Sequence, residues 1–321
     1  MNANLHDILT IQILGWNSAA HLPALLATLT PHAGEVQVRY IDNASEDNSV
    51  ALVQAALPDA DIVRVSENTG YCGGHNIGFA RCTTPFVLTV NPDTKLDWPG
   101  IKKLVEVLQH NATAGAGQGL LLRSQTPPVI DSAGIMRTIT LNGVDRGTGM
   151  ALEDFTVAPT EIDAATGACA LYRMEALKAV AYGSYEIAGH EALEVFDKDF
   201  FAYKEDVDLG WRLQRALWVT IFIPVTVAIH PRQLHADTKT SLAWITDTRT
   251  ALSLRNYMWM IAKNATGKQL LLHELFIDAR LIFFFLISLL YWPLLPVWVE
   301  TLRGLPDMLH KRSYEAIHNN R

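Results

Sequence analysis

The feature that most constrains the fold is an alternation of short apolar runs and helical patterns in the first third of the chain. The runs are rich in β-branched and aliphatic residues, as buried strands are, and cover residues 8–14, 36–41, 61–65 and 86–90. Helical spacing of leucines and valines separates the first three runs. Strands that alternate with helices favour a parallel, doubly wound α/β sheet, whose ligands bind at the carboxyl ends of the strands. The polar residues that follow each strand are therefore candidate site residues.

Local signals predict the other elements. Ser45 follows the second strand and is expected to cap the next helix, and a glycine-rich loop is expected over residues 68–76. The remaining predicted elements are a helix over 101–109, a hairpin at Asn142-Gly143, a strand-like segment with a glycine bend over 162–172, a strand over 219–229, and helices over 242–264 and 273–290. Two halves of one domain are expected, over 1–120 and 121–265, followed by a helical region over 266–321.

Four polar segments follow the predicted strands. They are Trp16-Asn17, Asp42-Asn43, the run Gly73-Gly74-His75-Asn76, and Asn91-Pro92-Asp93. An Asp at the end of a strand can accept from a base imide or a ribose hydroxyl, and glycines let the backbone approach a ligand closely. An Asp can also hold a divalent cation that bridges two phosphates. Taken singly, each segment is equally typical of a helix cap or a tight turn.

The stretch from Phe196 to Leu213 places several carboxylates among aromatic side chains. An apolar neighbourhood raises the pKa of a carboxyl group, which makes a general base usable near neutral pH. The alternative is a helix start, because acidic residues in a first turn interact favourably with the helix dipole.

In their order along the chain, these motifs resemble glycosyltransferase family 2, and more narrowly its bacterial rhamnosyltransferase-type members. The resemblance rests on WN, DNAS, NTGYCGGHNIGF, NPD and FFAYKEDVDLGWRL, and covers about residues 8–265. It implies a GT-A fold, which is Rossmann-like, and an inverting transfer of a sugar from a nucleoside diphosphate. It also implies that Asp206 is the general base, with Glu205 as its competitor. The residues that it places on the donor side are Trp16, Asn17, Asp42, Asn43, Gly73, Gly74, Asn76, Asn91, Asp93 and Gly167.

The resemblance further implies that Mg²⁺ or Mn²⁺ binds at the diphosphate through Asp93. Asn91 stands where many relatives carry the first Asp of a DxD motif, so a second ligand is needed. His230, at the end of the strand predicted over 219–229, matches a histidine that binds the metal in related enzymes. His235 follows closely and competes with His230 for this role.

Composition limits the other partners and the compartment. Apolar residues make up 49% of the 321 residues, which suffices for a large core. The formal net charge of -7 argues against an extended grip on nucleic acid. Three cysteines without a paired CxxC motif indicate neither a disulfide framework nor a zinc site, and favour a reducing compartment.

Residues 281–299 form an uncharged apolar segment that is interrupted by Pro293 and Pro296. Its length approaches the roughly 20 residues of a spanning helix, but the prolines favour a membrane-dipping hairpin or an interfacial helix. Basic residues on both flanks predict that both lie on the cytoplasmic side. We therefore expect a peripheral or monotopic protein at the cytoplasmic face of the inner membrane. A helix buried in a soluble core is the alternative.

The leading hypothesis is transfer of rhamnose from dTDP-rhamnose to a lipid-linked or cell-surface polysaccharide acceptor. Alternatives are transfer of another sugar from a UDP or GDP donor and, from a different class, a non-catalytic scaffold that binds sugar nucleotides. A sugar nucleotidyltransferase would carry a basic, glycine-rich loop after the first strand, and GWNSAAH is not such a loop. The sequence gives no prediction of the oligomeric state.

Overall fold

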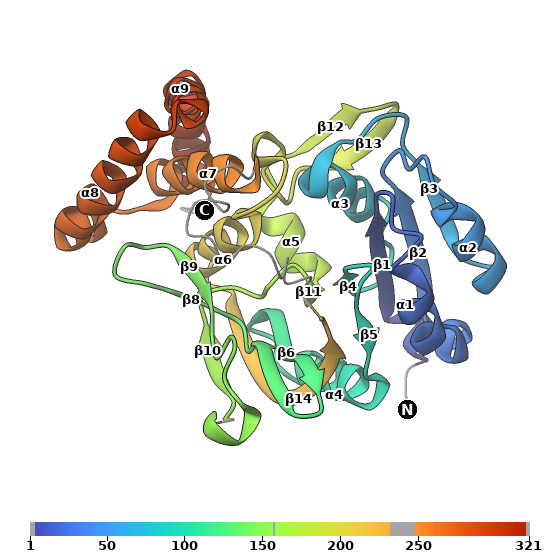
Figure 1. The fold of residues 1–321 in the computed structure, drawn as a ribbon. Helices are drawn as coiled ribbons and strands as arrows, with labels where there is room; N and C mark the ends of the chain where they lie inside the picture. Colours follow the sequence, from blue (N-terminus) through green and yellow to red (C-terminus); the bar gives the residue numbers. More distant parts are fainter. Residues whose placement is uncertain (1–3, 157, 232–247, 319–321) are drawn as a thin grey trace.

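The computed structural model describes residues 4–156, 158–231 and 248–318, and a ten-stranded sheet lies at its centre (Figure 1). The first half of the chain supplies β1 (Leu9–Gly15), β2 (Gln37–Asp42), β3 (Asp61–Arg64) and β4 (Phe86–Val90). These four strands are parallel and lie in the order β4-β1-β2-β3. The doubly wound parallel sheet that the sequence predicts is present in this half.

The second half of the sheet is mixed rather than parallel. β11 (Cys169–Arg173) runs antiparallel between β4 and β6 (Ala114–Gln125), and β14 (Val219–Ile229) is parallel to β6. The remaining strands are β5 (Lys95–Leu96), β7 (Pro128–Ser132) and β10 (Thr160–Ile162). The strand-like segment predicted over 162–172 belongs to two strands: β10 ends at Ile162 and β11 begins at Cys169. The chain between them, which contains Gly167, crosses from one strand of the sheet to another.

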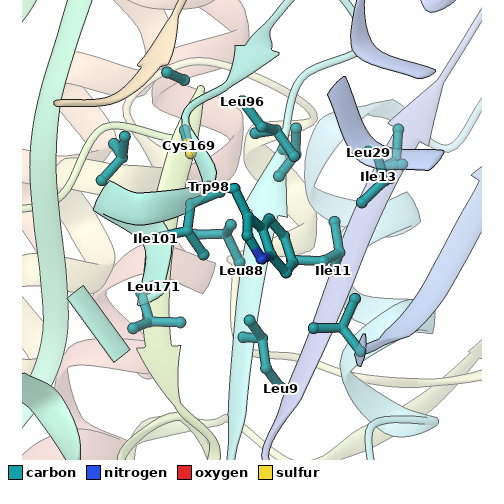
Figure 2. Close-up of a cluster of buried hydrophobic side chains, with 14 of the residues drawn as sticks. Leu9, Ile11, Ile13, Leu29, Leu88, Leu96, Trp98, Ile101, Cys169 and Leu171 are labelled. Atoms are coloured by element: carbon teal, nitrogen blue, oxygen red, sulfur yellow. The ribbon is translucent and has the colours of Figure 1, made fainter. Parts of the chain in front are cut away.

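Helices cover the sheet and complete its core. In chain order they are α1 (Leu22–Leu29), α2 (Ser49–Ala56), α3 (Gly70–Ala80), α4 (Trp98–His110) and α5 (Met174–Val180). Figure 2 shows Trp98 and Ile101 of α4 beside Leu9, Ile11 and Ile13 of β1, all of them buried. β1, β2 and β4 are buried on both faces, as their continuous apolar runs predict, whereas β3 is partly exposed at the edge of the sheet.

Two local predictions are wrong. α2 begins at Ser49 rather than next to Ser45, whose hydroxyl instead accepts from the backbone N–H of Asn17. The glycine-rich segment is no loop, because most of it forms α3. Packing outweighs the low helix propensity of glycine there: a Cβ at Gly74 would lie 2.3 Å from Leu14.

Short elements complete this part of the chain. The hairpin signal at Asn142-Gly143 is confirmed by the pairing of β8 (Ile135–Arg137) with β9 (Gly143–Asp145), and a second hairpin joins β12 (Ser184–Ile187) to β13 (His190–Leu193). The 3₁₀ helices are η1 (Leu5–Asp7), η2 (Thr30–Glu35), η3 (Leu152–Asp154), η4 (Lys198–Phe200) and η5 (Trp292–Leu294).

Four longer helices form the rest of the structure. They are α6 (Glu205–Arg215), α7 (Thr248–Asn264), α8 (Gly267–Leu290) and α9 (Leu295–His318). The apolar segment 281–299 is a helical hairpin, because Pro293 lies in η5 between α8 and α9. None of the described helices is long and apolar enough to cross a bilayer.

The hairpin of α8 and α9 lies at the end of the molecule away from β1–β3 (Figure 1). α9 packs on α7, where Gly304 leaves room for the ring of Trp259. In contrast, Ile277 and Ser288 are the buried side chains of the 24-residue α8. The C-terminal region is thus anchored to α7 through α9, while most of α8 faces solvent.

Candidate active site

A cavity of about 910 Å³ collects side chains that are far apart in the sequence. The ends of β1 and β4 contribute Trp16, Asn91 and Asp93, as expected for the carboxyl edge of a parallel sheet. From the second half of the chain come Gly167, Glu205, Asp206 and His230. These seven residues are the predicted site residues that the structure places at the cavity.

Glu205 and Asp206 form the start of α6, so the helix-start interpretation of the acidic stretch is also correct. Glu205 is buried, 6% exposed, and its Oε2 has no hydrogen-bond partner among the described residues. Burial, and then the neighbouring charge of Asp206, raise the pKa of Glu205 to about 8. Asp206 is half-buried at the cavity wall, and burial raises its pKa from the usual value. Glu205 therefore holds a proton at neutral pH, and Asp206 is the carboxylate that can act as a base.

The turn before these carboxylates is strained and is held by α7. Phe201, Tyr203 and Lys204 all have positive φ, between 63° and 72°, a region that non-glycine residues rarely adopt. Asn256 of α7 is buried, and its Nδ2 donates to the carbonyl oxygens of Phe200, Ala202 and Tyr203 at 2.8–2.9 Å. One amide group thus fixes the backbone that precedes Asp206.

The segment Arg255-Asn256-Tyr257 accordingly has a packing role. The Tyr257 hydroxyl donates to the carbonyl oxygen of Thr140 at 2.6 Å, and Arg255 donates to the carbonyl oxygens of Asp199 and Phe200. All three side chains therefore bind the backbone of neighbouring loops.

Asp93 and His230 form a second polar pair in the lining of the cavity. Nε2 of His230 lies 3.3 Å from Oδ1 of Asp93, and its Nδ1 donates to Oδ2 of buried Asp131 at 2.8 Å. Burial alone lowers the pKa of His230, but the hydrogen bonds to Asp131 and Asp93 outweigh it and raise the pKa to about 9. A carboxylate behind the distal ring nitrogen is the arrangement that orients a metal-binding histidine.

These residues fit a divalent cation that also takes ligands from its substrate. Among the described residues, no group of three or more His, Cys, Asp or Glu side chains can hold a metal ion without further ligands. Mg²⁺ is commonly bound by one or two carboxylates together with substrate phosphates and water. Asp93 and His230 would supply the protein ligands in such a site. His235, the competing candidate, lies outside the described residues.

Gly167 forms the floor of the cavity between Tyr71 and Asp206. The Tyr71 hydroxyl donates to the carbonyl oxygen of Gly167 at 2.7 Å, and the backbone of Gly167 hydrogen-bonds the Asp206 carboxylate. A Cβ at position 167 would lie 2.6 Å from the Tyr71 oxygen, so a larger residue would displace that ring. The glycine is required by this close approach.

Several predicted donor-binding residues lie away from the cavity lining. Asn17 and Asp42 accept hydrogen bonds from backbone N–H groups of the loop after β2, and Asn43 binds Asn68, Thr69 and Gly70. Gly73, Gly74 and Asn76 lie buried in α3, where Asn76 binds the backbone of Val195 and Phe196. The contacts of these six residues are with the protein itself.

The other carboxylates of the acidic stretch serve packing. Nζ of Lys263, fully buried in α7, lies 2.6 Å from Asp197 and 2.8 Å from Asp208. Asp208 also binds Arg212 at 3.0 Å, and Lys311 of α9 binds Asp197. Asp197, for which the sequence indicates no catalytic role, caps η4 and lies in a buried ionic network that joins η4, α6, α7 and α9.

Sequence reasoning also missed functional candidates. Asp131 lies on β7 and Asp145 on β9, and neither follows a strand of the parallel half. Asp145 lines the cavity, and its charge raises the pKa of Asp206. The hairpin signal at Asn142-Gly143 places Asp145 on a strand but does not show that the hairpin folds over the cavity. Lys204 and Arg249 line the cavity as well.

Comparisons with known proteins complete the description. A family model described as "Glycosyl transferase family 2" matches residues 13–181. The chain is similar to the "N-acetylglucosaminyl-diphospho-decaprenol L-rhamnosyltransferase" of Mycobacterium tuberculosis (strains CDC 1551 / Oshkosh and ATCC 25618 / H37Rv). They share 26% identity over 247 residues, which is 70% of this chain and 76% of the relative.

Solved structures share the fold. Residues 1–349 of S. aureus TarS superpose with a TM-score of 0.55 and 14% identity, covering 97% of this chain and 88% of that one. The mannosyltransferase PcManGT from Pyrobaculum calidifontis, in complex with GDP-Man and Mn²⁺, gives a TM-score of 0.52 and 15% identity, covering 96% and 73%. At these identities the likeness concerns the fold.

Proposed function

The chain belongs to glycosyl transferase family 2 and is a glycosyltransferase, and on this premise we propose that it performs an inverting transfer with Asp206 as the general base. The observation that carries the proposal is that one cavity is lined by two unlike groups of side chains. One is the half-buried carboxyl group of Asp206, and the other is the pair of Asp93 and His230. An inverting transfer needs a carboxylate on the acceptor side and positive charge at the leaving diphosphate.

The reaction follows from this arrangement. The Asp206 carboxylate takes the proton of the acceptor hydroxyl while that oxygen attacks the anomeric carbon of the donor. The bond from that carbon to the diphosphate oxygen breaks on the opposite face, and the nucleoside diphosphate leaves with the electron pair. Protonated Glu205 adds no negative charge beside Asp206, and so favours the ionised form of the base.

We propose that Mg²⁺ or Mn²⁺ binds at Asp93 and His230, with Asp131 orienting the imidazole. The bound cation would neutralise charge on the diphosphate. PcManGT, the structural relative solved with GDP-Man and Mn²⁺, supports a divalent cation in this fold. Exposed Trp16, at the cavity rim, is suited to stack on the nucleotide base or sugar.

The proposed donor is dTDP-rhamnose and the proposed acceptor is a lipid-linked or cell-surface polysaccharide precursor. The name of the mycobacterial relative, a rhamnosyltransferase that acts on a diphospho-decaprenol substrate, supports both choices. Transfer of another sugar from a UDP or GDP donor is the second candidate. A non-catalytic scaffold is the third candidate. The presence of Asp206, Asp93 and His230 in the lining of one cavity argues against it.

We also propose that the enzyme works at the cytoplasmic face of the inner membrane, as a peripheral or monotopic protein. The support is the solvent-facing apolar surface of α8. Leu271, Leu275 and Leu290 are each at least 76% exposed, although such side chains are normally covered in a soluble monomer. An acceptor with a lipid chain would then be met where the enzyme docks.

A thermal-shift panel tests the donor. Wild-type protein is heated with dTDP-rhamnose, UDP-glucose, UDP-N-acetylglucosamine and GDP-mannose, each with and without Mn²⁺. We expect the largest rise in Tm with dTDP-rhamnose and Mn²⁺, because ligands that bind the folded state stabilise it. A selective shift with a UDP or GDP sugar would replace the proposed donor.

Asp206→Asn tests the base. The variant keeps the size of the side chain but cannot take a proton, so transfer is expected to fall by at least ~10²-fold while the donor-induced shift in Tm is retained. Near-normal turnover in Asp206→Asn would remove this residue from the role, and Glu205→Gln is the matched comparison.

A further inference from the structure

A second hollow adjoins the active-site cavity. It is a groove of about 350 Å³ that shares Tyr203, Arg249 and Ser253 with the cavity and continues to Arg280 and Phe284 of α8. The groove therefore leads from the turn that carries the catalytic carboxylates to the solvent-facing helix. Neither the donor nor the base of the proposed reaction requires it.

Arg280 is built into this groove as a fixed cation. Its guanidinium carbon lies 5.0 Å from the ring centre of Tyr257 and 5.1 Å from that of Phe284, which holds the side chain in place. Its Nε is buried and has no hydrogen-bond partner among the described residues. No ion pair joins Arg280 to any carboxylate in the part of the chain that the structure describes. A buried donor on a charged group is costly to leave unsatisfied, so an anion is expected there.

Two further cations stand beside it. Arg249 lines both the groove and the cavity, and Lys204 lines the cavity next to the base. Burial, and also the positive charge of Arg280, lower the pKa of Lys204, so these two groups lie within electrostatic range. Positive charges gathered in a chain of net charge -7 indicate a site for a multiply charged anion.

Apolar side chains continue from the groove. Phe276 and Phe283 lie within about one helical turn of Arg280 on α8 and are 43% and 55% exposed. Cavity, cationic groove and apolar helix surface therefore follow one another in space. This order matches that of a molecule with a sugar, a charged linker and a hydrocarbon chain.

We propose that the groove at Arg280 and Arg249 binds the diphosphate of a lipid-diphosphate-linked sugar acceptor, with the sugar in the cavity and the lipid chain along α8. This inference rests on the proposed function, because it assigns the acceptor of the same reaction. The donor diphosphate has separate candidate partners in Asp93 and His230, which line the cavity but not the groove.

The test uses the full chain in detergent and three probes: farnesyl diphosphate, farnesol and dTDP. Isothermal titration calorimetry gives the Kd of each, and competition shows whether saturating dTDP displaces farnesyl diphosphate. The variants are Arg280→Gln and, as a matched control, Arg303→Gln at an exposed position of α9. Thermal melts report whether each variant folds.

We expect wild-type protein to bind farnesyl diphosphate at least about tenfold more tightly than farnesol, without displacement by dTDP. Arg280→Gln should weaken farnesyl diphosphate binding by about tenfold and leave the Kd of dTDP unchanged, and Arg303→Gln should change neither.

Equal binding of farnesol and farnesyl diphosphate, displacement by dTDP, or an unchanged Kd in folded Arg280→Gln would each overturn the proposed site. If Arg280→Gln does not fold, the wild-type competition alone decides. Loss of farnesyl diphosphate selectivity with intact dTDP binding contradicts only the acceptor groove. Absence of binding by any nucleotide or nucleotide sugar contradicts the proposed function instead.

Discussion

Two adjacent carboxyl groups of this site differ because their surroundings differ. Glu205 is enclosed by protein, with one carboxyl oxygen left unpartnered, whereas Asp206 reaches the cavity and accepts backbone hydrogen bonds from Val207 and Gly167. Environments that separate the pKa values of two acids assign their roles, the protonated group supporting the ionised one. The difference in protonation between Glu205 and Asp206 depends on burial, and it has a measurable consequence for stability.

Glu205→Gln is expected to stabilise the protein at neutral and alkaline pH. An unfolded Glu205 releases its proton near its ordinary pKa of 4.5, but the folded protein holds the proton up to about pH 8. Between these values the folded state binds more protons, so the free energy of unfolding of the wild type falls as pH rises from about 4.5 to about 8. Glutamine mimics the protonated acid, and removes this loss, which amounts to about 1–3 kcal/mol at pH 8.

Urea denaturation of the wild type and Glu205→Gln between pH 4 and pH 8.5 measures the effect. The two proteins should converge at acidic pH. The control Glu153→Gln, at an exposed position, should show no such divergence. Parallel curves for the wild type and Glu205→Gln would contradict a raised Glu205 pKa.

Asp131→Asn is expected to weaken Mn²⁺ binding by about tenfold or more, because removal of a carboxylate behind a metal-binding histidine typically has that effect. Asp131 accepts from Nδ1 of His230 at 2.8 Å and so keeps Nε2 directed at Asp93. Mn²⁺ titration followed by electron paramagnetic resonance, with dTDP present, measures the affinity. The control is Asp154→Asn at an exposed position, and an affinity equal to wild type in Asp131→Asn would remove Asp131 from this role.

Sequence reasoning found residues that follow strands and missed those whose place depends on tertiary structure. Asp93 could be identified because the end of a parallel strand is a general ligand position. Asp131 could not, because it reaches His230 across 99 residues of sequence from an edge strand. The family resemblance places Gly73 and Gly74 on the donor side, which stays a prediction, whereas the structure shows their close approach to Thr69 and Leu14.

At the scale of elements, the turn that precedes Glu205 and Asp206 is a strained segment that one helix holds in place. Positive φ values at Phe201, Tyr203 and Lys204 are unfavourable for non-glycine residues, so neighbouring contacts must compensate for the strain. α7 supplies them through Asn256, and the ionic network around Lys263 fastens α7 to α6. The position of Asp206 is therefore determined by a helix that begins more than 40 residues later in the sequence.

Asn256→Ala is expected to lower the free energy of unfolding by about 2–4 kcal/mol, since the buried amide group and its hydrogen bonds to three carbonyl groups of the turn are lost. It should also reduce kcat more than it weakens donor binding, because the relaxed turn displaces Asp206 while Asp93 stays in place. Urea denaturation and steady-state kinetics measure the two effects. Gln109→Ala, exposed on α4, is the control, and an unchanged kcat in folded Asn256→Ala would mean that the turn does not depend on α7.

The order of helices and strands along the chain could be predicted, because local sequence patterns indicate it. The pairing of the strands in the sheet could not be predicted in this way. Apolar runs identified β1, β2, β3, β4 and β14, and the expected GT-A fold agrees with the structural relatives. The antiparallel insertion of β11 between β4 and β6 has no local signal, because burial on both faces gives parallel and antiparallel strands the same apolar composition. For the same reason, the sequence does not show that the segment over 162–172 crosses between two strands of the sheet.

At the scale of the whole molecule, the chain has one well-packed body and one uncovered face. α9 is tied to the body by Lys311, which binds Glu194 at 3.0 Å and also Asp197. Among the described residues, no such ion pair joins α8 to the rest of the molecule. α8 exposes apolar side chains along most of its length. The hydropathy of residues 281–299 indicated such a region, and Pro293 indicated a hairpin. The sequence pattern does not show whether α8 or α9 packs on the rest of the molecule, because that depends on the tertiary contacts of α9.

The combined change Leu286→Ser, Leu289→Ser and Leu290→Ser is expected to release the protein from lipid vesicles with little change in folding. These side chains are 54%, 56% and 88% exposed, so each replacement should alter the free energy of unfolding by no more than about 0.5 kcal/mol. Inserted into a bilayer, each leucine contributes about 1.5–3 kcal/mol, so vesicle affinity should fall by well over tenfold. Flotation with phosphatidylglycerol vesicles in high salt measures the loss of vesicle affinity, since salt screens the contribution of basic residues.

Leu217→Ser is the matched control, because Leu217 is 87% exposed but follows α6 rather than lying on α8. Flotation of the triple variant at the wild-type level would show that α8 does not hold the enzyme at the membrane.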